Sequence, residues 1–251
     1  MLAQFYLHQY LRTAMSSYLD KMQRCFDEWV SKTGYTLRNK NIILAVSGGS
    51  DSVAMMYLID SIRKRYSLNL YVLHVDHGVR GFESRLDALF VNNLSEEFNI
   101  PYILREISKS KKISEENLRD WRYKIFAEES ERLDADVFIA HTKNDNIETI
   151  LFNLFRGTGP AGLCGIPFSR NFGHHIIFRP ILFADRADLE ILLREKRLNW
   201  REDKTNSDST FTRNYIRNEI MPLFYKRFGM DSLDRILNTS LLQKQLVDSE
   251  S

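Results

Sequence analysis

The residues best suited to chemistry stand together between residues 41 and 52. Residues 42–46 are apolar and predict a buried strand, the sequence Ser-Gly-Gly-Ser-Asp-Ser fills residues 47–52, and a helical run begins at Val53. Glycines let a backbone approach an anion closely, and free amides at a helix start point toward it. The candidate ligands of the anion are Ser47, Gly48, Gly49, Ser50, Asp51 and Ser52. We expect amides and hydroxyls to bind phosphate and Asp51 to hold a cation or a hydroxyl group.

This loop lacks the Gly-Lys-Ser/Thr sequence of ordinary kinases and GTPases, whose loop grips the terminal phosphates. It resembles instead the pyrophosphate-binding loop of the ATP pyrophosphatase enzymes, which cleave ATP to AMP and pyrophosphate. The resemblance implies ATP as the nucleotide, with Asp51 as the candidate ligand for Mg²⁺. An ordinary glycine turn before a helix is the alternative interpretation.

A second polar cluster lies in residues 73–80, which begin in a predicted strand and end in a glycine turn. His74, Asp76, His77 and Arg80 therefore gather at a strand tip. Histidine and aspartate also bind zinc, but the alternating positions on a strand and the lack of a further cluster with ligand spacing argue against a zinc site. We expect His74 and Asp76 to contact the nucleotide beside the phosphate loop.

A third cluster follows the predicted fourth strand, where His141 precedes a helix. Asp145 and Glu148 are three residues apart, so one helix face presents both carboxylates. Acidic residues are favoured at a helix start in any case. Beside an ATP site the same pair could bind an ammonium group or Mg²⁺.

Arg119 and Arg122 also share one helix face. An exposed arginine pair is usually only a solvated surface. If the pair faces an ATP site, it neutralises phosphate charge during transfer.

Strands and helices alternate from residue 41 onward. The predicted strands are 42–46, 70–75, 102–106 and 137–140, and the predicted helices are 53–65, 83–98, 114–133 and 145–156. This order predicts an α/β fold with an open, mostly parallel, Rossmann-like sheet between helices. Ligands of such sheets bind at the carboxyl ends of the strands, and all three polar clusters fall there.

The flanking segments are less regular. Residues 1–40 predict a helical extension whose apolar stripe packs on the domain or binds a partner. Residues 157–165 predict a mobile glycine-rich loop, 178–182 a last strand, 185–197 a helix, 200–217 mostly loop and 223–246 further helix.

Composition excludes several classes of protein. The 251 residues include 43% hydrophobic and 27% charged residues and contain no apolar run long enough to cross a bilayer. Cys25 and Cys164 give no disulfide framework and fit a reducing compartment. A formal net charge of +2 does not by itself indicate nucleic-acid binding, so such binding must rest on local basic segments. The candidates are Arg156, Arg201, Lys204, Arg213, Arg217, Lys226 and Arg227.

The order of these motifs resembles the tRNA(Ile)-lysidine synthetases from about Asn41 to Phe224. The matching segments are Ser-Gly-Gly-Ser-Asp-Ser, His-Val-Asp-His-Gly-Val-Arg, Arg119–Tyr123, Leu154–Gly159, Arg179–Leu182, Trp200–Asp203 and Arg213–Arg217. The family uses ATP to adenylate the wobble cytidine of an isoleucine tRNA with a CAU anticodon, and L-lysine then displaces AMP to give lysidine.

The resemblance implies a role for each candidate residue. The catalytic candidates are Asp51, Arg119, Arg122, His141, Asp145 and Glu148, and the candidates for tRNA or lysine are Asp145, Glu148, Arg156, Arg201, Arg213 and Arg217. Taken with the pattern along the chain, we expect a helical extension (1–40), a catalytic domain (41–222) and a helical tail or linker (223–251). The expected compartment is a bacterial cytoplasm or a plastid stroma, and a homodimer stays open.

The chain departs from the family pattern in three places. Asn144 and Asn146 stand where Asp and Gln are usual, and Pro160-Ala161 stands where a basic residue is frequent. Many members also continue into a region that recognises the acceptor stem, so we expect either a minimal or a truncated form. The N-terminal extension is longer than the family leads us to expect.

Three other functions remain open at this point. A tRNA-thiolating enzyme would share the loop but needs cysteines or an iron–sulfur cluster. An amidating enzyme of NAD or GMP synthesis would have no obvious use for the segments at 200–203 and 213–217. A binding module without turnover is the non-catalytic alternative, and the Asn144 and Asn146 changes are compatible with it.

Overall fold

A six-stranded sheet forms the centre of the part of the chain that the computed structural model describes, residues 17–76, 81–106, 115–202, 212–229 and 231–250. The strands are β1 (Asn41–Ala45), β2 (Asn69–Asp76), β3 (Tyr102–Glu106), β4 (Asp136–Ile139), β5 (Ser169–Phe172) and β6 (His175–Phe178). Their order is β3-β2-β1-β4-β6-β5, and all neighbours are parallel except the β5–β6 hairpin. The predicted open, mostly parallel sheet is confirmed.

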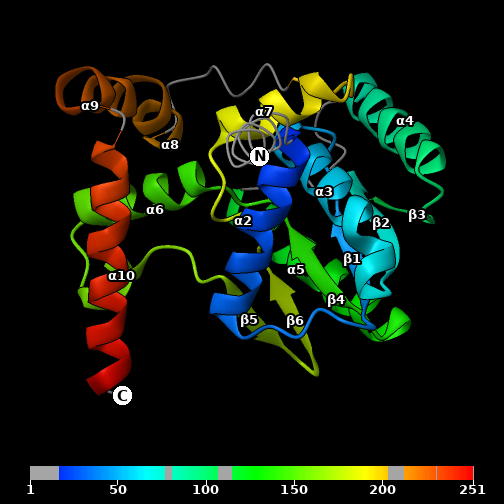
Figure 1. The fold of residues 1–251 in the computed structure, drawn as a ribbon, viewed down its shortest axis with the longest axis horizontal. Coiled ribbons are helices and arrows are strands. Elements are labelled where there is room, and N and C mark those ends of the chain that lie inside the picture. Colours follow the sequence, from blue (N-terminus) through cyan, green and yellow to red (C-terminus); the bar gives the residue numbers. More distant parts are fainter. Residues whose placement is uncertain (1–16, 77–80, 107–114, 203–211, 230, 251) are drawn as a thin grey trace, which may run out of the picture.

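The helices cover both faces of this sheet (Figure 1). They are α2 (Tyr18–Thr33), α3 (Ser50–Tyr66), α4 (Phe82–Glu97), α5 (Glu115–Leu133), α6 (Lys143–Arg156), η1 (Pro160–Cys164), α7 (Arg186–Glu195), α8 (Thr212–Tyr215), the π-helical η3 (Ile216–Ile220), α9 (Met221–Phe228) and α10 (Ser232–Glu250). The four predicted strand–helix units are confirmed, with boundaries that shift by a few residues.

Alternation along β1 divides the core between the two faces. Ile42 and Leu44 point to one face and pack with α2, α3 and α7, whereas Ile43 points to the other face and packs with α5. Successive side chains of a strand point to opposite faces, so an apolar run without alternation predicts burial on both sides. The two layers fix the strand ends from which the polar residues project.

Helix α2 belongs to the main core. Ser17 and Asp20 form a capping box at its start, and Met22, Phe26 and Val30 are buried against the domain. The predicted packing of the extension on the domain is therefore confirmed for residues 18–33, and residues 1–16 lie outside the described residues.

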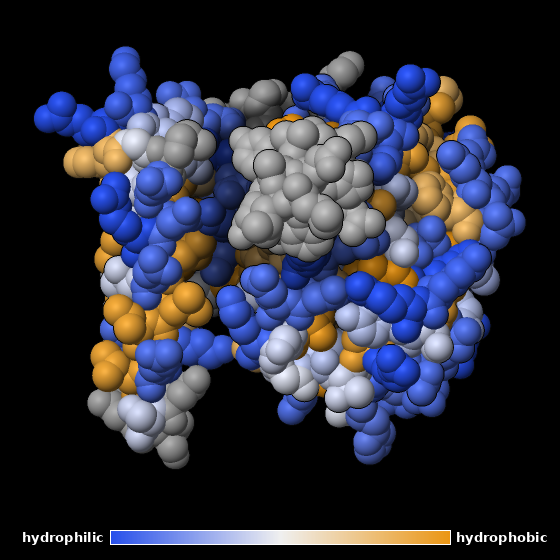
Figure 2. Space-filling view, viewed as in Figure 1, coloured by the Kyte–Doolittle hydropathy of each residue, from blue (hydrophilic) through white to orange (hydrophobic). Residues whose placement is uncertain are grey.

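The C-terminal helices gather on α6 rather than on the sheet. Ile147 and Leu151 of α6 pack with Ile216, Met221 and Leu233 in a separate apolar cluster. Apolar surface remains exposed along α10 (Figure 2), where the outward leucines are Leu241, Leu242 and Leu246. The predicted boundary between residues 222 and 223 falls inside α9.

Four local predictions differ in part from the structure. The last strand ends at Phe178 because Pro180 has no N–H to donate to a ladder, and residues 180–183 form a turn instead. Residues 212–217 are helical, and η1 forms inside the predicted loop at 157–165 and contacts α10. The predicted helix 223–246 is interrupted at Gly229, whose φ is +83°.

Candidate active site

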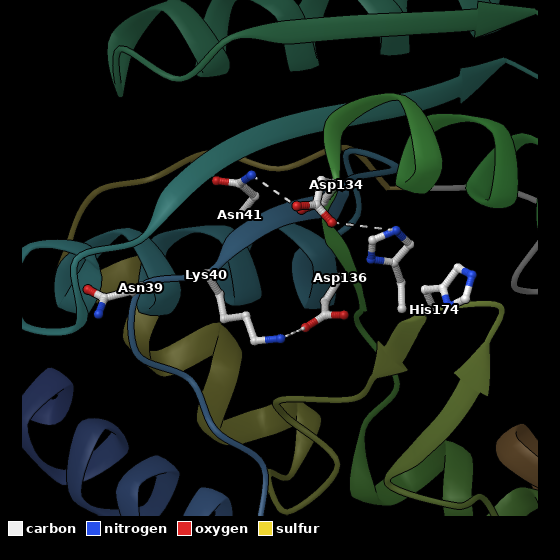
Figure 3. Close-up of a pocket in the computed structure, with 7 residues that line it drawn as sticks. Asn39, Lys40, Asn41, Asp134, Asp136 and His174 are labelled. Carbon is white, nitrogen blue, oxygen red and sulfur yellow. Dashed lines mark hydrogen bonds and ion pairs between the residues drawn. The ribbon is translucent and has the colours of Figure 1, made fainter.

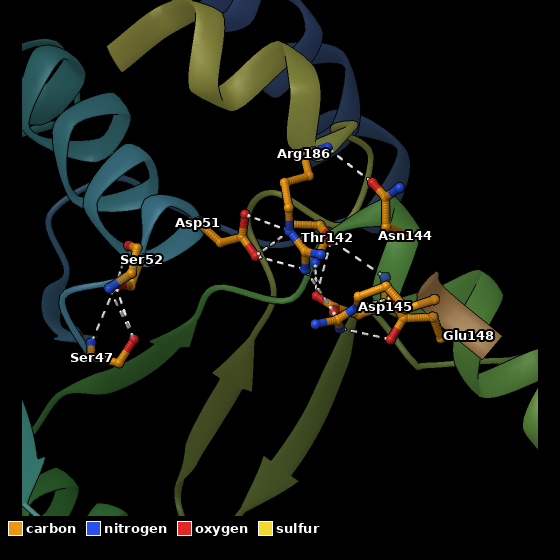
Figure 4. A network of polar contacts seen from close by, with 10 residues as sticks. Ser47, Asp51, Ser52, Thr142, Asn144, Asp145, Glu148 and Arg186 are labelled. Carbon is orange, nitrogen blue, oxygen red and sulfur yellow. Dashed lines mark hydrogen bonds and ion pairs between the residues drawn. The ribbon is translucent and has the colours of Figure 1, made fainter. Parts of the chain in front are cut away.

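The three polar clusters meet at the carboxyl edge of the sheet. Residues 47–52 follow β1, His74 and Asp76 end β2, and His141 follows β4. β1 and β4 are neighbours whose following helices α3 and α6 begin side by side (Figure 4), and strand order switches at this point. The structure thus brings the first and third clusters together as predicted. Of the other candidates, His77, Arg80 and Lys204 lie outside the described residues.

The phosphate loop is held by its own serine. The Ser52 hydroxyl accepts hydrogen bonds from the backbone N–H groups of Ser47 and Gly48, both at 3.2 Å, and donates one to the Gly49 carbonyl at 2.9 Å. Gly48 has a φ of +96°, which side-chain-bearing residues rarely adopt. The N-cap of α3 is Gly49, which has no side chain to cap the first-turn amides, so these remain available to an anion.

Asp51 is bound by an arginine from distant sequence. Nε of Arg186 lies 3.2 Å from Oδ1 and 3.0 Å from Oδ2 of Asp51, and Nη2 lies 2.9 Å from Oδ2 (Figure 4). Burial raises the pKa of Asp51, the charge of Arg186 opposes that rise, and the nearby Asp145 adds to it. The backbone N–H of Arg186 donates to Oδ1 of Asn144 at 2.9 Å, which fixes the start of α7 beside the start of α6.

Asp145 and Glu148 share a face of α6, as predicted. Oδ2 of Asp145 accepts from the backbone N–H of Thr142 at 2.8 Å and so caps the helix. Oδ1 of Asp145 is 3.2 Å from Nη2 of Arg186 and also 3.2 Å from Nη2 of Arg217. The helix-capping and the site-facing interpretations of Asp145 therefore both hold, one for each carboxylate oxygen.

Glu148 is buried and forms a two-pronged ion pair. Nε and Nη2 of Arg217 lie 2.6 Å and 2.7 Å from its two carboxylate oxygens. Burial raises the pKa of Glu148 and the contact with Arg217 opposes that rise. Three carboxylates, from Asp51, Asp145 and Glu148, thus share two guanidinium groups, and the network keeps one formal negative charge.

His141 is held by a buried arginine. Nε of Arg179 donates to Nδ1 of His141 at 3.1 Å, and Nη1 of Arg179 donates to the Pro167 carbonyl at 2.7 Å. Burial and the charge of Arg179, with smaller contributions from Arg122 and Arg119, lower the pKa of His141 to about 4, and the charge of Asp145 opposes this shift. The imidazole is therefore neutral near pH 7, and the charges of both α5 arginines reach the site.

His74 contacts the residue that precedes the phosphate loop. It is buried, and its Nδ1 lies 2.8 Å from the carbonyl oxygen of Val46, the last residue before the loop. Asp76, at the end of the same strand, is half-buried. Burial of Tyr102, together with the nearby charge of Asp76, raises the pKa of Tyr102 to about 12. The contact that the structure gives His74 positions the loop.

The four arginines predicted to contact substrate occupy three different places. Arg217 lies inside the acidic network, and Arg201 pairs with Asp87 at 2.8 Å while its backbone N–H donates to the Gly48 carbonyl at 2.9 Å. Arg156 and Arg213 are exposed and lie over the Phe152 ring, 5.1 Å and 5.3 Å from its centroid. The second pair is presented on the α6–α8 surface.

Asn144 and Asn146, which depart from the family pattern, both bind backbone. Asn144 holds the start of α7, and Oδ1 of Asn146 accepts from the Ile166 N–H at 2.6 Å. A side chain at Gly165, whose φ is +70°, would collide with that Asn146 oxygen. The two amides position loops around the site, while Asp145 and Glu148 carry its negative charge.

Sequence reasoning missed Arg179 and Arg186 as site residues. Arg179 stood in a recognised segment without an assigned role. Arg186 is the first residue of α7, where the helix dipole disfavours a positive charge, and that misplaced charge was the available signal.

A polar cavity of about 190 Å³ lies at the opposite, amino edge of the sheet (Figure 3). Its buried Asp136 accepts from Tyr35 at 2.7 Å and from the Ile176 N–H at 2.8 Å, and lies 3.1 Å from Nζ of Lys40. These contacts join the segment between α2 and β1 to β4 and β6, so we assign the cluster a structural role. Among the described residues, no group of three or more His, Cys, Asp or Glu side chains could hold a metal by itself, and no helix there could span a membrane.

Comparison of the sequence with known proteins gives one family model and several curated relatives. A PP-loop domain family model matches residues 18–224. A tRNA(Ile)-lysidine synthase of Clostridioides difficile is 33% identical over 218 residues, which cover 84% of this chain and 46% of that protein. A tRNA(Ile)-lysidine synthase of Chlorobaculum tepidum is 35% identical over 228 residues, which cover 87% of this chain and 68% of that protein.

The fold also matches a solved structure, the U34-tRNA thiolase NcsA from Methanococcus maripaludis with its [4Fe-4S] cluster. The two structures superpose with a TM-score of 0.74 at 18% sequence identity, and the match covers 92% of this chain and 79% of that chain. This likeness shows a shared fold. This chain spans about half the length of the first curated relatives that it matches. The family match and the identity to the Chlorobaculum protein establish that this chain belongs to the tRNA(Ile)-lysidine synthase family of PP-loop proteins.

Proposed function

We propose that this protein uses ATP to attach L-lysine to the wobble cytidine of the CAU-anticodon isoleucine tRNA, giving lysidine. The observation that carries this proposal is the placement of two carboxylates beside the phosphate loop. Arg186 joins Asp145 to Asp51 of the loop helix, and Arg217 joins Glu148 to Asp145. An anion cradle and a carboxylate pair next to each other suit a reaction that joins a nucleotide to an amine. The names of the curated relatives support the choice of tRNA and lysine.

The first step is adenylation. The carbon-2 oxygen of the cytidine attacks the α-phosphorus of ATP, and the bond from that phosphorus to the pyrophosphate oxygen breaks. The amides of residues 47–50 and the start of α3 bind the phosphates, and the charges of Arg119 and Arg122 oppose the negative charge that develops.

Asp51 fits a role toward Mg²⁺. Nucleotide sites hold Mg²⁺ with one or two carboxylates plus phosphate oxygens, and Asp51 presents its carboxylate at the first turn of the loop helix. Bound there, the ion would neutralise charge on the leaving pyrophosphate.

The second step is the transfer to lysine. The side-chain amine, once deprotonated, attacks carbon 2 of the activated base, and AMP leaves with the former base oxygen. The negative charge of Asp145 and Glu148 attracts the lysine ammonium and orients it next to the adenylate. Arg156 and Arg213 offer exposed cations to the RNA backbone.

The direct test is incubation of the protein with ATP, labelled lysine and a CAU-anticodon isoleucine tRNA transcript, followed by nucleoside analysis. Label in lysidine, dependent on all three substrates, is the expected result. Label-free tRNA, or sulfur incorporation when a sulfur donor is supplied, would overturn the proposal.

The bacterial sources of the relatives support a bacterial cytoplasm as the compartment of this protein, with a plastid stroma as the alternative. A measurement of the molecular mass in solution tests whether the protein forms a homodimer.

A further inference from the structure

Arg186 stands between two carboxylates that belong to different parts of the site. Its guanidinium contacts Asp51 of the phosphate-loop helix at 2.9–3.2 Å and Asp145 of α6 at 3.2 Å. The arginine is the first residue of α7, where the helix dipole opposes a cation, and its backbone is fixed by Asn144. The two carboxylates therefore supply the interaction that keeps this charge in place.

The two carboxylates depend on Arg186 to different degrees. Asp145 keeps Thr142 and Arg217 as partners if Arg186 leaves. Among the described residues, Asp51 is hydrogen-bonded by Arg186 alone. Removal of the Arg186 charge would leave three carboxylates with one guanidinium, a partly buried site with strong attraction for a cation.

We propose that Arg186 is a positioning residue whose guanidinium occupies the cation-binding position between Asp51 and Asp145 until a nucleotide binds. Nucleotide phosphates then draw the guanidinium away from Asp51, and the freed carboxylate accepts the Mg²⁺ that accompanies the nucleotide. The exchange makes metal binding conditional on ATP, so free Mg²⁺ does not fill the site in advance. This inference rests on the proposed function for the identity of the nucleotide and for the role of Asp51 toward Mg²⁺.

The geometry allows this exchange. The Arg186 side chain is 25% exposed, so it can move toward bound phosphate without crossing the core. Guanidinium binds phosphate oxygens with the same two-pronged geometry that it uses on a carboxylate. The movement leaves Asp145 in its helix cap and in contact with Arg217, so the lysine side of the site keeps its shape.

The test measures the thermal midpoint of unfolding in Mg²⁺ alone, in ATP alone and in both, with no tRNA or lysine present. A ligand that binds only the folded state raises that midpoint in proportion to the logarithm of its concentration over Kd. The wild-type protein should respond to ATP with Mg²⁺ but not to millimolar Mg²⁺ alone. Arg186→Gln should respond to Mg²⁺ alone, with an affinity at least about tenfold higher than that of the wild type.

The matched control is Arg194→Gln, on the same helix, where the arginine is exposed and pairs with Glu190. It should behave as the wild type. Asp51→Asn combined with Arg186→Gln should lose the response to Mg²⁺ alone, because the freed carboxylate is then absent.

If Arg186→Gln does not fold, Arg186→Lys tests the proposal instead, because lysine keeps the positive charge but lacks the forked guanidinium that bridges both carboxylates. It should show a smaller response of the same sign. An equal response of wild type and variant to Mg²⁺ alone, or no response in either variant, overturns the proposal. Since tRNA and lysine are absent, either result leaves the test of lysidine formation unaffected.

Discussion

Arg186 and Arg217 converge on one atom, Oδ1 of Asp145, each at 3.2 Å. The first arginine begins α7 and the second lies in the π-helical η3, so two elements from the second half of the chain complete a site whose phosphate loop follows β1. Asp145 ties both to the start of α6. The C-terminal helices are therefore part of the site and not only an attachment to it.

The Arg217–Glu148 pair should be important for stability. Arg217→Gln leaves a buried carboxylate without its partner, which should cost about 2 to 3 kcal/mol of unfolding free energy, reduced by the partial exposure of the arginine. Urea unfolding at pH 7 measures the loss. Arg213→Gln, from an exposed arginine nearby, should change the value by less than about 0.5 kcal/mol, and equal effects of the two substitutions would contradict this account.

His141 should make the protein less stable in mild acid. Its pKa is about 6.5 in an unfolded chain and about 4 in the folded protein. Between these values the unfolded chain binds more protons, so stability is highest above pH 6.5 and falls as the pH drops toward 4. His141→Gln should lose stability less steeply over this range, measured as the urea midpoint at each pH. Parallel curves for wild type and variant would show that His141 does not titrate this way.

Arg156 and Arg213 should contribute to RNA binding through charge. Removing one cation that binds an RNA phosphate should flatten the log–log dependence of tRNA affinity on salt by roughly one unit. Arg156→Ala and Arg213→Ala should each show this change, whereas Arg194→Ala, on a different helix, should not. Filter binding across a salt series distinguishes the two surfaces, and unchanged slopes would remove this pair from the RNA interface.

Sequence alone predicted the parts of the site that are local. The phosphate loop, the four strand–helix units and the shared face of Asp145 and Glu148 all depend on residues close in sequence, and the structure places them as expected. Arg186 could not be paired with Asp51 in this way, because 135 residues separate them and only the assembled fold brings them together.

The segment 212–220 shows a second limit of sequence reasoning. The polar residues of 200–217 favour a loop, but Ile216 is fully buried against α6, and Arg217 on the same short helix faces the carboxylates. A helix that supplies charge to a site has a weak apolar pattern, so periodicity underestimates it.

The role of Glu148 tests the central claim most directly. Steady-state kinetics of Glu148→Gln should show a KM for lysine raised about tenfold or more, with the KM for ATP and tRNA-dependent pyrophosphate release nearly unchanged. The carboxylate attracts the ammonium group, and its ion pair is with Arg217 and not with the phosphate loop. Glu128→Gln, an exposed change on α5, serves as the control. A shift in the KM for ATP with the KM for lysine unchanged would contradict the account.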